Sequence, residues 1–140
     1  MVIVDTSEKY IKMCESAKDI QRQWNFKIED YIFDPAYGEA RVWFGYPSKE
    51  YKEIVWLPRQ DQLQEICIEF NIQNLRMSRS EAFFHFLGWY SICLKETYDN
   101  GRNIGKNGEY GEINSCEELM LKYTMMLMYW KRWDGEKWVK

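Results

Sequence analysis

Apolar residues recur at helical spacing in four stretches of the chain, and each stretch has a recognisable start. Capping boxes at residues 5–8, 78–81 and 115–118 supply side chains that bond the first free N–H groups of a helix. Pro58 opens the remaining stretch, and its missing N–H costs nothing there because the first N–H groups of a helix have no partner within the helix. The pattern predicts four helices, over residues 6–23, 58–70, 78–98 and 115–132.

Between the first two predicted helices, the pattern changes to short runs rich in aromatic and β-branched residues. Turn signals separate these runs around residues 34–38 and 47–48. The runs predict a small antiparallel meander of three strands, over residues 27–33, 41–46 and 51–57. Together, the elements predict a single α+β domain over residues 1–140, with about four helices packed against a three-stranded sheet.

Residues 99–114 hold four of the chain's eight glycines together with four asparagines, a composition typical of a loop. Segment 101–107 lacks the glycine spacing, the final Ser or Thr and the preceding strand of a phosphate-binding loop. The loop is therefore either a connector or a segment that binds a partner, and its role stays open.

Seven Trp, ten Tyr and seven Phe accompany a single His in this chain. Aromatic residues supply apolar surface for cores and interfaces, whereas His supplies much of the acid–base and metal chemistry near neutral pH. The net charge is only −3, and the Lys and Arg residues are scattered rather than gathered in a basic run. The composition favours packing and recognition over catalysis and gives little sign of a nucleic-acid surface.

Cys14, Cys67, Cys93 and Cys116 form no C-x-x-C pair and fall within predicted helices. We expect them to be reduced thiols of a cytoplasmic protein. The first residues lack the basic and apolar regions of a signal peptide, and no apolar run approaches the roughly 20 residues that span a bilayer. The sequence therefore predicts no membrane segment.

His85 and three acids are the candidates for catalytic or metal chemistry. His85 has no recognisable nucleophile or orienting carboxylate as a partner, which favours a structural role. Asp61, Glu65 and Glu69 line one face of a predicted helix and can bind a divalent cation. The apolar residues opposite them favour an amphipathic helix with its acids in water. We predict no metal and no cofactor.

The last two predicted helices carry apolar residues on more than one side. In the first of them, one stripe contains Phe83, Phe86 and Leu87, and another contains His85 and Trp89. Such helices lie in the centre of a core or have a second partner. Two interpretations therefore stay open: a layered core, or an exposed apolar patch that binds a partner.

Three segments carry a family resemblance: residues 9–15 with Ile20 and Trp24, residues 56–65 (WLPRQDQLQE) and residues 133–138 (WDGEKW). The chain resembles small uncharacterised proteins encoded by phages and prophages of Gram-positive bacteria, and residues 56–65 are the most specific part of the match. The resemblance implies a phage-related origin and a cytoplasmic location in the bacterial host. It implies no activity and no catalytic residue.

Residues 56–65 also have an interpretation of their own. They predict a strand-to-helix corner kept for folding, or else a recognition surface formed by Arg59, Gln60 and Gln62. Near the end of the chain, Asp134-Gly135 predicts a tight turn that brings Trp133 close to Trp138.

The leading functional hypothesis is a non-catalytic protein-interaction module that binds itself or a host factor. The residues expected to bind the partner are Tyr123, Met126, Trp130, Trp133 and Trp138. The first alternative is a nucleic-acid-associated accessory protein, which would bind through Arg76, Arg79, Lys131 and Arg132. The second is an enzyme with a carboxylate-based site, which needs a pocket lined by at least two acids with His85 nearby.

Overall fold

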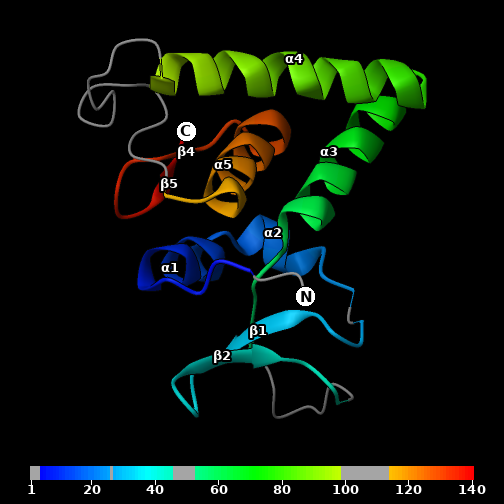
Figure 1. Cartoon of the computed structure of the whole chain (residues 1–140). Helices are drawn as coiled ribbons and strands as arrows, with labels where there is room; N and C mark the ends of the chain where they lie inside the picture. Colours follow the sequence, from blue (N-terminus) through cyan, green and yellow to red (C-terminus); the bar gives the residue numbers. More distant parts are fainter. Residues whose placement is uncertain (1–3, 26, 46–52, 99–113) are drawn as a thin grey trace.

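The computed structural model describes residues 4–25, 27–45, 53–98 and 114–140, with side chains up to residue 88 in the long helix α4 (Arg79–Tyr98). Helices and antiparallel strands are both present in these residues, which confirms the predicted α+β class. Figure 1 shows α4 across one end of the molecule, the larger sheet at the opposite end and the other helices between them.

The first predicted helix is divided in two, α1 (Glu8–Ser16) and α2 (Lys18–Arg22). Ala17 leaves the helical conformation between them, with φ −79° and ψ 64°. Gln21 Nε2 donates to the Cys14 carbonyl at 3.1 Å and to the Trp56 carbonyl at 2.9 Å. Gln21 Oε1 accepts from the Trp56 N–H at 2.8 Å. The break thus lets α2 hold a strand that lies far away in the sequence.

The larger sheet contains three strands, β1 (Tyr31–Asp34), β2 (Glu39–Val42) and β3 (Val55–Trp56). Their order is β2-β1-β3, so the first strand is central and the connection differs from the predicted meander. Both residues of β3 are buried, and α1 packs beside them. Burial therefore draws β3 to the edge of β1 near the helices, whereas the more exposed β2 takes the other edge.

Asp30 explains why β1 begins later than predicted. Its carboxylate accepts hydrogen bonds from the Lys27 N–H at 3.0 Å, Trp24 Nε1 at 2.8 Å and Gln62 Nε2 at 2.7 Å. These bonds close a turn before the strand, in which Glu29 has a φ of 75°. A buried carboxylate is stable here because donors surround it.

Helix α3 (Gln60–Leu75) begins after Pro58 and continues past the predicted end at residue 70. The Arg59 N–H donates to Gln62 Oε1 at 3.0 Å at its start, and Arg76 ends it in the left-handed region with a φ of 52°. The capping box predicted for α4 is present. The Ser78 N–H donates to Glu81 Oε2 at 2.7 Å, and the Glu81 N–H donates to Ser78 Oγ at 3.3 Å.

Helix α5 (Cys116–Tyr129) ends earlier than predicted, because Trp130 turns into the left-handed region with a φ of 57°. A short hairpin follows, formed by β4 (Arg132–Trp133) and β5 (Trp138–Val139). Trp133 lies opposite Trp138, with ring centroids 5.2 Å apart. The predicted turn at Asp134-Gly135 is therefore confirmed.

The core lies where α1, β3, α3 and α5 meet. Tyr10 of α1 is fully buried and donates its hydroxyl to the Pro58 carbonyl at 2.6 Å. Glu118 of α5 is also buried, and its carboxylate lies 2.6 Å from Lys9 Nζ and 3.1 Å from Lys122 Nζ. These contacts fix α1 against α5, so both ends of the chain belong to one core.

Candidate protein interface

The structure does not bring the five residues expected to bind a partner together on one exposed surface, and Trp133 and Trp138 pack against each other and the core. Tyr123 is buried in the core, where its ring lies 5.9 Å from that of Phe86, and Met126 is half-buried against the same core. Trp138 Nε1 donates to the Met13 carbonyl at 3.0 Å, which ties the terminal hairpin to α1. Of this set, Trp130 is the one residue left largely open to solvent, with 81% of its side chain exposed.

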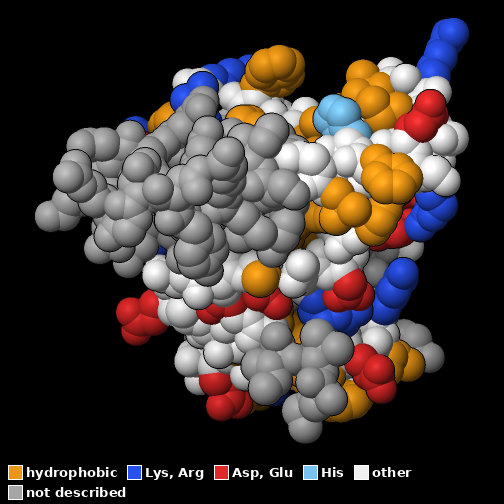
Figure 2. All heavy atoms as spheres, turned by 45° about the horizontal axis from the view of Figure 1, so that its top comes forward, with side chains coloured by type: hydrophobic (Ala, Val, Ile, Leu, Met, Phe, Trp, Pro, Cys, Tyr) orange, Lys and Arg blue, Asp and Glu red, His pale blue; other side chains and the backbone are white. Residues whose placement is uncertain are grey.

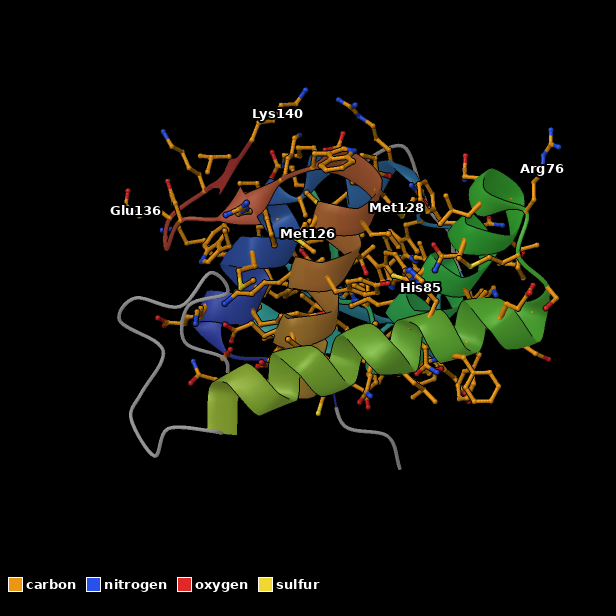
Figure 3. The ribbon with its side chains drawn as sticks, turned by 90° about the horizontal axis from the view of Figure 1, so that it is seen from above. Arg76, His85, Met126, Met128, Glu136 and Lys140 are labelled. Atoms are coloured by element: carbon orange, nitrogen blue, oxygen red, sulfur yellow. The ribbon has the colours of Figure 1, made fainter. Side chains whose placement is uncertain are left out.

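The four basic residues of the nucleic-acid alternative also lie apart. Arg79 forms ion pairs with Glu65 at 2.6 Å and Glu69 at 2.9 Å, and Lys131 pairs with Asp19 at 2.7 Å. Arg76 and Arg132 are exposed, but they belong to the α3–α4 corner and to β4, which lie on opposite sides of the molecule (Figure 1). Figure 3 likewise shows Arg76 far from the chain end at Lys140. These residues form no common basic face.

The acids on α3 are engaged in ion pairs. Asp61 lies 3.0 Å from Arg59, and Glu65 and Glu69 both bond Arg79. Among the described residues, no group of three His, Cys, Asp or Glu is placed to hold a metal ion. The acidic row thus links α3 to its own N-terminus and to the start of α4.

A hollow of about 550 Å³ lies between the turn before β1 and the first half of α3. Its walls include the Trp24 and Trp56 rings, which are parallel with centroids 6.1 Å apart. The acids that line it are Glu29, Asp30, Asp61 and Glu65. His85 projects from α4 and is not among the residues that line this hollow. The hollow therefore has the acids that the enzyme alternative needs, but not the histidine.

Arg59 and Gln62, two of the three residues suggested as a recognition surface, line this hollow, whereas Gln60 does not. The Arg59 guanidinium bonds Asp61, and this contact raises the pKa of Arg59. Gln62 is bonded to Asp30. Both side chains thus hold the strand-to-helix corner together.

The outer face of α4 presents exposed apolar residues that the predicted set of partner-binding residues did not include. Ala82 and Phe86 are buried against the rest of the chain. Phe84 lies between them in sequence, and at about 100° per residue it points to the opposite side of the helix. Its side chain is 70% exposed, and those of Phe83 and Leu87 are 39% and 37% exposed. We call Phe83, Phe84, Leu87 and Gly88 the outer face of α4.

Figure 2 shows hydrophobic side chains gathered around the histidine on this part of the surface. The rings of Phe83 and Phe84 contact each other edge to face, with centroids 6.2 Å apart. A solvent-facing helix side normally carries charged residues. The outer face instead presents apolar groups over about one and a half turns, which is typical of an interaction surface.

Gly88 carries no side chain, and we call the gap that this leaves in the outer face the notch. A Cβ placed on it would meet no neighbouring atom within 4 Å, and its backbone has no positive φ that would require glycine. Gly inside a helix is less stable than Ala by about 0.5–1 kcal/mol. The described part of the fold therefore gives no reason for a glycine at this position.

One signal in the sequence marks the outer face. Phe84 belongs to neither apolar stripe predicted for the helix, and Gly88 follows it by one turn on the same side. An aromatic residue on the expected polar strip, next to a glycine, indicates a surface with a use other than folding. The apolar stripes alone do not locate this surface, because they do not reveal which side of the helix faces inward.

The thiols differ in accessibility. Burial raises the pKa of Cys14 well above its ordinary value and that of Cys67 to about 12. Cys116 is exposed, and none of these three residues forms a disulfide. Cys93 and Trp89 lie outside the described side chains, and residues 99–113 of the glycine-rich loop lie outside the described residues.

In the part of the chain that the structure describes, no helix has the length and apolar character to cross a bilayer. No protein family, no curated protein and no solved structure matches the chain.

Proposed function

We propose that this chain is a non-catalytic protein-interaction module whose partner docks on the outer face of α4. The observation that carries the proposal is the apolar, uncharged surface formed by Phe83, Phe84 and Leu87, which the described part of the chain leaves exposed. The surplus of aromatic residues over catalytic ones in the sequence fits the same function.

The exposed area of Phe84 gives the scale of this surface. Since an aromatic side chain buries about 200 Å², covering the 70% of Phe84 that is exposed removes about 140 Å² from water. At about 25 cal/mol per Å², this burial contributes roughly 3.5 kcal/mol before the cost of ordering the partner. One ring of this size can serve as the anchor of an interface.

A phage or prophage origin and a place in the bacterial cytoplasm belong to the same proposal. The support is the resemblance of residues 9–15, 56–65 and 133–138 to phage-encoded proteins. The reduced thiols of Cys14, Cys67 and Cys116 fit a reducing compartment.

Site-specific photo-crosslinking in bacterial cells tests the proposal. Phe84 is replaced by p-benzoyl-phenylalanine in one variant and Phe44 in another, because Phe44 is 75% exposed on a different part of the surface. We expect a discrete protein adduct from position 84 and none from position 44. Absence of any protein adduct at position 84, or equal labelling at both positions, contradicts the proposal.

A further inference from the structure

We infer that the partner of the outer face is a second copy of this chain, paired through α4 in a two-fold antiparallel contact. In this arrangement, Phe84 of each copy fills the notch at Gly88 of the other. The inference rests on the proposed function and names its partner.

The outer face is complementary to itself in shape. Phe84 protrudes with most of its ring in solvent, and Gly88 provides an open notch one turn further along. Residues four apart share one side of a helix. A two-fold axis midway between them makes each protruding ring meet a notch, as a self-complementary contact requires. The same axis brings Leu87 of the two copies together beside it.

Charge also favours a second copy. A two-fold contact places each charge near its own counterpart, so a self-associating surface must be uncharged around the axis. Phe83, Phe84, Leu87 and Gly88 carry no charge, and the exposed Glu81 lies further from the axis and accepts a bond from Ser78. Arg79, at the start of the helix, is turned toward α3 by its bonds to Glu65 and Glu69. A net charge of −3 therefore does not oppose this contact at short range.

The area sets the expected affinity. From their exposed fractions and a side-chain area of about 200 Å², Phe84 and Leu87 offer about 210 Å² of apolar surface per copy, whereas Phe83 projects away from the axis. A standard interface buries about 800 Å² per partner, slightly more than half of it apolar. These two side chains supply about half of that apolar area, so we expect a weak, reversible dimer with a dissociation constant in the micromolar range.

Sedimentation equilibrium of the full chain between about 1 and 200 µM tests the inference. The wild type should pass from monomer to dimer over this range. Phe84→Ser removes the protruding ring, and Gly88→Leu fills the notch with a good helix former. Each should raise the dissociation constant about 100-fold or more, because an anchor is lost on both copies. Phe44→Ser is the control and should associate like the wild type.

Circular dichroism shows whether each variant is folded, and Gly88→Leu is expected to melt no lower than the wild type. A wild type that stays monomeric at 200 µM overturns the inference. A dimer that persists in both folded variants overturns the placement on α4. If the wild type is monomeric but position 84 still crosslinks to a different protein, the second copy is excluded while the proposed function stands.

Discussion

Asn71 tests whether a buried amide without hydrogen-bond partners lowers the stability of this protein. It lies in α3 with no solvent exposure, and neither its Nδ2 nor its Oδ1 has a hydrogen-bond partner. A buried polar group without a partner costs about 1–3 kcal/mol. Leu branches at the same atom as Asn and has no polar group to satisfy. Asn71→Leu should therefore raise the free energy of unfolding by about 1–3 kcal/mol.

Urea unfolding followed by circular dichroism measures this gain as a higher midpoint with an unchanged slope. For a chain of this size, each kcal/mol raises the melting temperature by about 3–4 °C. The matched control is Asn74→Leu on the same helix. Asn74 is exposed and donates to the Phe70 carbonyl at 2.9 Å, so its replacement should change stability by no more than about 0.5 kcal/mol.

The reasoning is refuted if Asn71→Leu lowers stability by about 1 kcal/mol or more while Asn74→Leu stays near neutral. That result would mean that the amide of Asn71 makes hydrogen bonds in the folded protein. A gain in both variants of equal size would instead assign the effect to the helix-forming tendency of Leu.

Two further predictions concern titratable groups. Hydrogen bonds from Ser78 lower the pKa of Glu81, so the stabilising contribution of this carboxylate is present above the ordinary glutamate pKa and is lost as the pH falls through the lowered value. The urea midpoint of Glu81→Gln should therefore lie below that of the wild type at pH 7 and approach it near pH 3. An equal difference between the two midpoints at both pH values would contradict this. In the folded protein, a maleimide should label Cys116 quickly, while Cys14 and Cys67 should react only after unfolding because burial raises the pKa of both thiols. Peptide mapping by mass spectrometry measures the labelling, and equal labelling of the three cysteines in the folded protein would contradict the prediction.

The elements that the sequence determined by itself are those with local causes. The capping box of Ser78 and Glu81 starts α4 where it was predicted, because both partners lie within one turn. The turn at Asp134-Gly135 likewise brings Trp133 against Trp138 through nearby backbone geometry. Such features depend on neighbouring residues, and the pattern of residue types is enough to predict them.

The tertiary structure decided what depends on contacts between distant residues. The helix break at Ala17 accompanies the bonds between Gln21 and Trp56, and the position of β3 follows from its burial beside α1. Periodicity showed that α4 is apolar on more than one side, but only packing selected Phe86 for the core and left Phe84 in solvent. The candidate interface depends on that selection, because the side of a helix that faces outward is set by the elements packed against its other side.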